Sequence, residues 1–339
     1  MRRTLKPVYF LATALVLLVF PRWLDSYSQY LVNMAMAYIF VCLGLNLLLG
    51  YAGQFAFANA AFMGIGAYTA ALLTTRLGWP FLLALPMSGV LAVILGIAVA
   101  MPALRMSTVY LAMVSLAFAE LVQWILIHWK SVTLGTDGVR VPSPTILGYG
   151  IHSDRGIYYI VLAISVLGYW VAYRLTHSKY GRAFIAVRES EIVARCSGIN
   201  VERVKTLAFA LSAFYAGVGG GLFSLTLRFV VPDGFGLDQL ILQFSMVLIG
   251  GLGSLVGSVI GAAVLTALPE LLRSVQSYQE ILYGVLLVGF ILFMPRGIAG
   301  LLIRFGLLQH EVLARGADTA FADRQSHAAS PTPTKIGPA

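Results

Sequence analysis

The side chains of this chain that could act on a small molecule are mostly uncharged, and they interrupt runs that are otherwise apolar. They are Asn46, Gln54, Asn59, Ser115, Gln123 and Gln243, with one carboxylate, Glu120. Amides and hydroxyls can hydrogen-bond a zwitterion or an amide without holding it too tightly to leave. We therefore regard these positions as candidates for a translocation path. The alternative for each is a bond between helices, worth about 0.6 kcal/mol.

Glu120 is the carboxylate that lies well inside an apolar run, at residues 114–124. An ionisable side chain within a membrane marks a functional site by default. The alternative is a glutamate that hydrogen-bonds across a helix bundle and fixes its packing. Both interpretations stay open, and a single acid is thin support for a carrier coupled to protons or sodium.

Catalytic motifs are absent from the sequence. It contains no Gly-x-x-x-x-Gly-Lys-Ser/Thr, no Gly-x-Ser-x-Gly and no His-Glu-x-x-His, and its histidines fall outside the apolar runs. Two cysteines give no disulfide framework. We therefore expect no enzymatic activity, and if transport is driven by ATP, another chain must hydrolyse it.

Composition places the chain in a membrane. Of its 339 residues, 59% are hydrophobic and 11% are charged, whereas soluble domains carry about 25% charged residues. The apolar runs are continuous rather than alternating, which excludes a transmembrane β-barrel. We expect an all-α, polytopic protein of about 10 transmembrane helices; 8 or 9 also fit, because 239–251 is short and could be re-entrant. The expected spans are 7–24, 31–50, 57–76, 80–102, 107–127, 156–175, 206–227, 239–251, 255–272 and 280–295.

The distribution of Lys and Arg gives these spans an orientation. With a cytoplasmic N-terminus, 16 of the 23 basic residues lie inside and 7 outside, as the positive-inside rule requires. The net charge of +9 is therefore explained by the membrane topology and does not indicate binding to nucleic acid. We expect a multi-pass transmembrane domain at 1–310, with an ordered periplasmic loop at 128–155. A cytoplasmic segment at 176–205 and a disordered cytoplasmic tail at 311–339 complete the organisation.

The segment 176–205 is basic and has helical periodicity. Residues 181–196 predict one short helix, with Phe184, Ile185, Ile192 and Val193 on one side. Gly198 is a suitable stop and Asn200 a plausible cap for the next helix. Such a helix could lie on lipid or fit a groove of a partner. The helix–turn–helix between two spans favours a lever that docks a partner.

Small residues predict close helix packing. Gly253, Gly257 and Gly261 recur every four residues and would lie on one helix face, against a helix of this chain or of a second subunit. Residues 50–54 and 250–254 each place glycines within an apolar run, a weak internal echo of the kind that transporters show.

Several motifs in order resemble the permease subunits of branched-chain amino acid ABC importers, in particular the LivM-type member of the permease pair. They occupy residues 44–54, 60–68, 110–120, 135–138, 181–184, 198–201, 248–254 and 268–270. The resemblance implies a bacterial inner-membrane importer that works by alternating access. Its partners would be a second permease subunit, two ATP-binding subunits that bind ATP and magnesium, and a periplasmic substrate-binding protein; this chain would hold no cofactor. The segment that contacts an ATPase would include Gly181, Arg182, Arg188, Glu189, Glu191 and Gly198.

One stretch departs from that family. Ser-Leu-Gly-His commonly follows the Gly-Gln pair, and this chain has Ala56-Phe-Ala-Asn59. If that region touches the cargo, the same machine could import urea, short amides or aromatic acids. A secondary carrier or channel is the alternative of a different class, which the sparse intramembrane charge disfavours.

Overall fold

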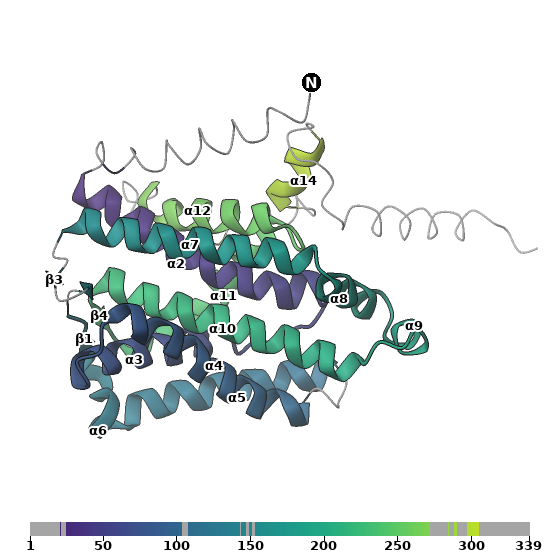
Figure 1. The fold of residues 1–339 in the computed structure, drawn as a ribbon, viewed down its shortest axis with the longest axis horizontal. Coiled ribbons are helices and arrows are strands. Elements are labelled where there is room, and N and C mark those ends of the chain that lie inside the picture. Colours follow the sequence, from purple (N-terminus) through teal and green to yellow (C-terminus); the bar gives the residue numbers. More distant parts are fainter. Residues whose placement is uncertain are drawn as a thin grey trace, which may run out of the picture.

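The computed structural model describes residues 21, 25–103, 108–142, 144–146, 149–150, 153–271, 284, 288–289 and 297–304. They form a bundle of roughly aligned helices, with short strands at one end and two small helices, α8 and α9, at the other (Figure 1). We call these the strand end and the α8–α9 end. The predicted spans 7–24 (apart from residue 21) and 280–295 (apart from residues 284, 288 and 289) and the tail 311–339 lie outside the described residues.

Every span predicted between residues 31 and 272 is a helix. The long apolar helices are α2 (Ser26–Asn46), α4 (Phe81–Ala103), α5 (Thr108–His128), α7 (Asp154–Thr176) and α10 (Val201–Leu227). Shorter ones are α3 (Asn59–Arg76), α11 (Leu237–Gly250), α12 (Leu255–Leu271) and α14 (Gly297–Arg304). The helical membrane fold is confirmed, while the total of ten helices and the side of the N-terminus stay predictions.

Helix α2 does not end in an ordinary turn. It continues as a π-helical segment, η2 (Leu47–Tyr51), and residues 52–58 then leave the helix before α3 begins. A π-helical turn is rare and frequently marks a functional site. We call residues 52–58 the α2 break.

The strand end adds small β-ribbons to the expected all-α fold. β1 (Val139–Arg140) pairs antiparallel with β4 (Phe229–Val230), and β2 (Thr145–Ile146) pairs with β3 (Tyr149–Gly150). The other elements there are α6 (Lys130–Thr133), η3 (Gly135–Asp137) and η4 (Pro232–Phe235). Arg76 Nη2 donates to the carbonyl oxygens of Ser131 and Val132. The described part of the predicted loop at 128–155 is therefore an ordered cap.

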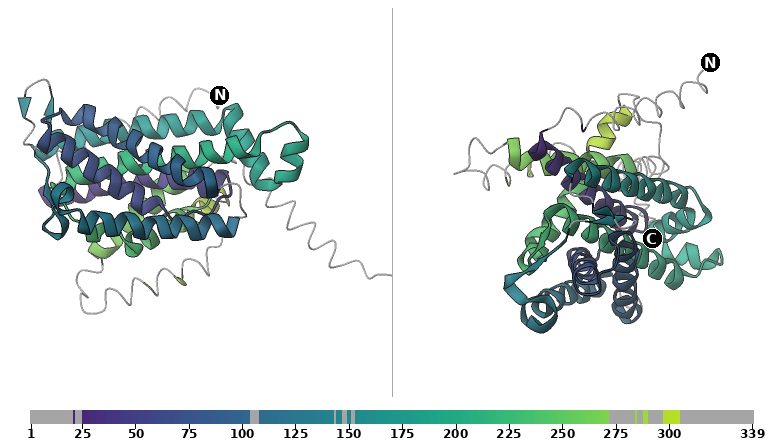
Figure 2. Two further views of the ribbon diagram at one scale, coloured as in Figure 1. Left: turned by 90° about the horizontal axis from the view of Figure 1, so that it is seen from below. Right: turned by 60° about the vertical axis from the view of Figure 1, so that its left-hand side comes forward.

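Helix α10 is the centre of the bundle, packed against α2, α3 and α4 (Figure 2). A Cβ atom on Gly219 would overlap the side chain of Val41 in α2, and one on Gly220 would overlap the carbonyl oxygen of Met63 in α3. A Cβ on Gly217 would lie 2.7 Å from the carbonyl oxygen of Ser88 in α4. Small residues let helix backbones approach this closely in a membrane. The glycines of α10 therefore allow α2, α3 and α4 to pack closely against it.

The prediction of a single Gly253–Gly257–Gly261 helix face is wrong in one member. Gly253 lies in the turn before α12 with φ +76°, because the chain reverses there between α11 and α12. Gly257 and Gly261 do share a face, and Cβ atoms on them would overlap backbone atoms of Gly250 and Met246 in α11. Their packing partner is thus a helix of the same chain.

Replacing Gly261 with Val should destabilise the α11–α12 pair. The added side chain would collide with backbone that cannot rotate away, and overpacking of this kind costs about 1–3 kcal/mol. Unfolding of purified protein in mixed micelles would measure the loss. Ala263→Val, at an exposed position of the same helix, is the matched control and should leave stability nearly unchanged. Equal effects of the two substitutions would contradict this account of the packing.

Candidate functional site

Asn46 fastens the end of α2 to the turn between α11 and α12. Its side-chain Nδ2 donates to the carbonyl oxygen of Ser254 (2.8 Å) and to Ser258 Oγ (2.7 Å). Its Oδ1 accepts from the backbone N–H of Gly253 at 2.7 Å. Asn46 is fully buried, so these bonds are made away from solvent. Its contacts within the chain are those of a packing residue.

The same contact brings together the two glycine-rich segments that the sequence pairs. Gly50 lies so close to Gly253 that a Cβ atom on it would overlap the Gly253 backbone nitrogen. Gly297, at the start of α14, approaches Gly251 in the same way. Three separate parts of the chain therefore meet through backbone contacts, and side chains at these glycines would separate them.

Two predicted path residues, Asn59 and Gln243, are joined in the interior. Asn59 Nδ2 donates to Gln243 Oε1 at 2.7 Å, and Ser212 Oγ donates to Asn59 Oδ1 at 3.3 Å. Gln243 Nε2 also lies 3.1 Å from the Met63 sulfur. Asn59 and Gln243 are 2% and 0% exposed. These amides connect α3, α10 and α11 near the point where α3 leaves the α2 break.

Gln54, in the α2 break, differs from these amides. It is 4% exposed, yet neither its Oε1 nor its Nε2 has a hydrogen-bond partner among the described residues. Leaving a buried polar group unpaired costs about 1–3 kcal/mol, so such a group in a native protein calls for an explanation. Gln54 lines a cavity of about 200 Å³ at the α8–α9 end.

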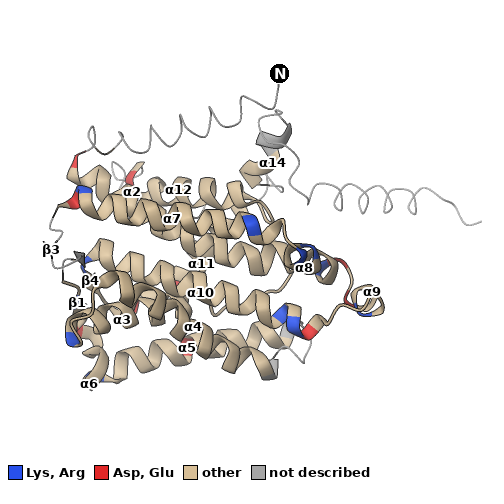
Figure 3. Ribbon diagram, viewed as in Figure 1, with Lys and Arg blue, Asp and Glu red and all other residues tan. Residues whose placement is uncertain are grey.

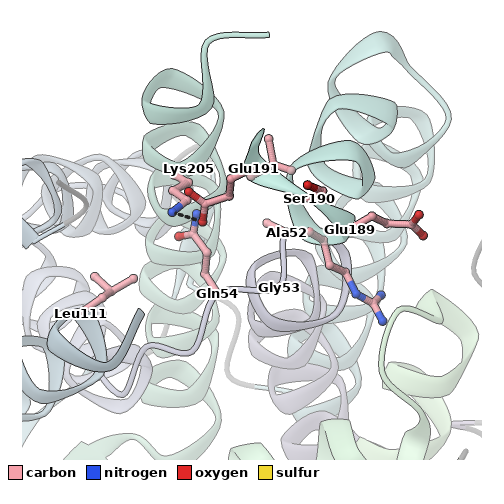
Figure 4. A pocket seen from close by; sticks show the side chains of 10 residues that line it. Ala52, Gly53, Gln54, Leu111, Glu189, Ser190, Glu191 and Lys205 are labelled. Atoms are coloured by element: carbon pink, nitrogen blue, oxygen red, sulfur yellow. Dashed lines mark ion pairs between the residues drawn. The ribbon is translucent and has the colours of Figure 1, made fainter. Parts of the chain in front are cut away.

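The walls of that cavity join the two sets of residues that the sequence predicts separately. Gln54, Ala52 and Gly53 come from the α2 break, and the α8–α9 segment, α10 and Leu111 of α5 complete the lining. Lys205 Nζ pairs with Glu191 at 2.5 Å, and Gln54 points toward this ion pair (Figure 4). The Lys205 side chain is 11% exposed and that of Glu191 42%. The ion pair therefore links α9 to the start of α10 beside the break.

Arg188, at the end of α8, holds the α2 break from the other side. Its Nη1 donates to the carbonyl oxygen of Gly50. Gly53 has φ +68°, and a Cβ atom there would lie 2.7 Å from Arg188 Cγ. Glycine is needed at this position because the backbone is left-handed and the arginine stem lies directly over it. The predicted coupling residue Arg188 thus contacts the predicted path segment.

The α8–α9 segment is two helices, so the single helix predicted for 181–196 is wrong. α8 (Lys179–Glu189) and α9 (Glu191–Cys196) meet at Ser190, which is extended (φ −161°) and accepts at its hydroxyl from the N–H of Val193. Serine favours such an N-cap over the interior of a helix. The kink also splits the predicted apolar side, since Phe184 is buried while Ile192 and Val193 are 76% and 63% exposed.

The predicted stop at Gly198 and the predicted cap at Asn200 are confirmed as local structure. Gly198 has φ +80°, and the N–H of Ile199 returns to the carbonyl oxygen of Ala194 at the end of α9. Asn200 caps α10 by accepting from the N–H of Arg203 at 3.0 Å. Gly181 packs against the Thr176 backbone at the end of α7, while Arg182 and Glu189 are exposed. The segment is thus held at defined points between α7 and α10.

The remaining candidates lie on α5 and do not gather at the cavity. Ser115 is buried and its Oγ accepts from the backbone N–H of Phe57, which satisfies part of the α2 break. Gln123 lies against Gly236 at the start of α11. Glu120 is exposed along the same helix.

Lys205 is the functional candidate that sequence reasoning missed. It lies in the first turns of α10, where a lysine is expected from the positive-inside rule alone. Its residue type therefore does not indicate a functional role. Between Glu191 and Lys205 the chain passes through α9 and the turn at Gly198. The sequence separation of the two residues therefore does not predict that they are in contact. The hydrogen-bonding partners Ser212 and Ser258 were missed for the same reason, because they lie on helices remote in sequence.

Comparison with known proteins relates this chain to a family of transport proteins. The family model described as "Branched-chain amino acid transport system / permease component" matches residues 27–293. The permease protein LivM of the high-affinity branched-chain amino acid transport system of Salmonella typhimurium is 33% identical over 320 residues, covering 87% of this chain and 75% of that protein. LivH of Escherichia coli is 27% identical, covering 79% and 93%.

A relative of another description is the autoinducer 2 import system permease protein LsrC of Salmonella paratyphi B, which is 27% identical and covers 62% of this chain and 68% of that protein. No solved structure is a significant match. The family model and the LivM similarity each cover most of the chain. The chain therefore belongs to the family of permease components of branched-chain amino acid transport systems.

Proposed function

We propose that this chain is a permease subunit of an ATP-driven importer that carries branched-chain or related amino acids into the cytoplasm of a bacterium. The observation that carries the proposal is the match to the permease family over residues 27–293, together with 33% identity to LivM. The chain would act beside a second permease subunit in the inner membrane. Two ATP-binding subunits would bind and hydrolyse ATP with magnesium, and a periplasmic protein would deliver the cargo.

The α8–α9 end is the cytoplasmic end in this proposal. Figure 3 shows basic residues at both ends of the bundle and almost none along its middle. The α8–α9 end carries the larger basic set among the described residues, which includes Arg174, Lys179, Arg182, Arg188, Arg195, Arg203 and Lys205. The strand end carries Arg76, Lys130, Arg140, Arg155 and Arg228. The positive-inside rule supports this orientation.

The α8–α9 segment is the proposed contact for an ATP-binding subunit. Ile192 and Val193 are exposed apolar side chains on α9, beside the exposed Arg195. These two apolar residues lie between the charged residues Glu191 and Arg195 of a short helix at the end of the bundle. Such a helix could bind in a groove of a partner protein. Arg188 and Glu191 instead contact Gly50 and Lys205, so their proposed role is to transmit movement of this segment to the α2 break.

The α2 break is the proposed cytoplasmic part of the translocation path. Gln54 supports this assignment, because its buried amide has both a donor and an acceptor to offer. Asn59 and Gln243 would join the path only after their mutual hydrogen bond opens. Irregular backbone in a membrane is tolerated where it is covered by protein or lines a water-filled route, which agrees with a gate at this point.

A different small polar cargo is the second candidate. It is favoured by residues 56–59, which depart from the family pattern directly beside Gln54 and end at Asn59. The similarity to a permease described as importing autoinducer 2 also supports a wider range of cargo in related chains.

Reconstituted transport tests the proposed function. Proteoliposomes that hold this chain, its neighbouring permease and ATP-binding subunits, and the binding protein should accumulate labelled leucine only with ATP. Isoleucine and valine should compete. Hydrolysis of ATP stimulated by the binding protein without leucine uptake would retain the ABC permease and reject the branched-chain cargo. Uptake by this chain alone, without ATP, would contradict the proposal.

Charge reversal tests the link between α9 and α10. Glu191→Lys and Lys205→Glu should each lower ATP-driven uptake about two- to fivefold, which corresponds to about 0.5–1 kcal/mol for a partly exposed pair. The double variant restores an opposite-charge pair and should recover most of the uptake. If both single variants transport normally, or if the double variant is as impaired as the worse single variant, the ion pair does not transmit the movement.

The docking surface is tested by placing a charge on α9. Ile192→Asp should weaken co-purification of the ATP-binding subunit, because a buried unpaired carboxylate is costly in an interface. The matched control is Leu77→Asp, at a 63% exposed apolar residue beyond α3 at the strand end. Both variants should insert normally into the membrane. Retained binding by the Ile192 variant, or equal loss in the control, would remove α9 from the interface.

A further inference from the structure

Glu120 is exposed near the middle of a membrane-spanning helix. It lies eight residues before the end of α5 (Thr108–His128), so it is about 12 Å along the helix axis from that end. Its exposed neighbours on α5 are large and apolar: Met113 is 65% exposed, Leu121 53% and Trp124 58%. We call Met113, Leu116, Glu120, Leu121 and Trp124 the α5 face.

The exposed faces of α4 and α7 differ from the α5 face. On α4 the exposed residues include Leu83, Met87, Val90 and Ile94, and the exposed positions in residues 81–101 carry no charge. On α7 the exposed residues between 156 and 173 are likewise apolar or aromatic, among them Leu167. Of α4, α5 and α7, only α5 has an exposed carboxylate near the middle of the helix.

Lipid is an unfavourable neighbour for the α5 face. An acidic side chain at the centre of a membrane helix costs about 2.5–3.5 kcal/mol on insertion scales, and such groups almost always face a bundle interior or a hydrated cavity. A glutamate is too short to reach the surface from this depth. The entirely apolar faces of α4 and α7 meet lipid without this cost.

We propose that the α5 face is the surface on which the second permease chain packs, with Glu120 enclosed between the two chains. This inference rests on the proposed function, because it takes the partner from the two-permease importer. This chain is similar to both kinds of permease, with 33% identity to LivM and 27% identity to LivH. A related chain can supply both the apolar cover for Met113 and Leu121 and a donor for the Glu120 carboxylate.

Site-specific photo-crosslinking tests the surface. A photoreactive phenylalanine analogue is placed at Met113 or Leu121 in the assembled transporter, and at Ile94 or Leu167 as controls. Each control is 58% exposed and lies 13 residues after the start of its helix at the strand end, and Met113 lies 15 residues before the end of α5 at the same side. Irradiation should join Met113 and Leu121 to the partner permease, while the controls should give lipid adducts only.

Three outcomes would overturn the proposal. The first is lipid adducts alone at Met113 and Leu121, and the second is a partner adduct from the controls but not from α5. The third is a link from α5 to another segment of this same chain, which would make the cover intramolecular. ATP-driven uptake by each labelled transporter is measured in parallel, so failure of the proposed function is distinguished from failure of the interface.

A second variant separates enclosure from simple exposure. Glu120→Leu removes the carboxylate at an apolar surface. If the α5 face meets lipid, this chain should insert and co-purify with the partner permease as well as before. Enclosure at the interface predicts that co-purification falls severalfold, because the partner's donor is left unpaired, and that Glu120→Gln retains most of it.

Discussion

The amide of Asn46 joins two places in the described part of the bundle where regular helical hydrogen bonding is interrupted. One is the π-helical end of α2 with the break that follows, and the other is the turn between α11 and α12. In a bilayer every buried backbone group must find a partner within the protein. Asn46 satisfies Gly253 and Ser254 while Gly50 and Gly253 approach to backbone contact. The break can therefore exist in an apolar environment without unravelling the adjacent helices.

From that junction the polar groups divide into two kinds. Asn46, Ser115 and the Asn59–Gln243 pair use their hydrogen bonds within the chain. They join α2 to the α11–α12 turn and α12, α5 to the break, and α3 to α11. Gln54 keeps its amide unpaired beside the Lys205–Glu191 ion pair. In the proposed function, a small movement of α8–α9 would act on the α2 break, while the glycine contacts around α10 would hold the centre of the bundle.

The sequence predicts the parts of the structure that depend on local chemistry. Long apolar runs predict the helices, Gly198 predicts the stop after α9, and Asn200 predicts the cap of α10. The kink at Ser190 was missed, because a helical period continues through it and the serine hydroxyl competes only by a single capping bond. Gly253 was assigned to a helix for a similar reason, since its spacing from Gly257 is helical although its φ is +76°.

Contacts between distant segments were beyond sequence reasoning. Spacing places Arg188 on one segment and Gly50 on another, and nothing in their types pairs them. The sequence also left open whether each amide joins helices or lines a path. The fold separates them, because a buried amide with partners and a buried amide without partners are equivalent in sequence and differ only in three dimensions.

Distances between spin labels test most directly whether α8–α9 and the α2 break move as one unit. Labels at Val193 and Phe55 report on the two segments, and Leu77 at the strand end is the reference; all three are exposed, and Cys196→Ser removes the exposed native thiol. Between nucleotide-free and ATP-bound transporter, the account predicts an unchanged Val193–Phe55 distance and an altered Val193–Leu77 distance. A Val193–Phe55 distance that changes as much as the reference distance, or two distances that both stay fixed, would contradict it.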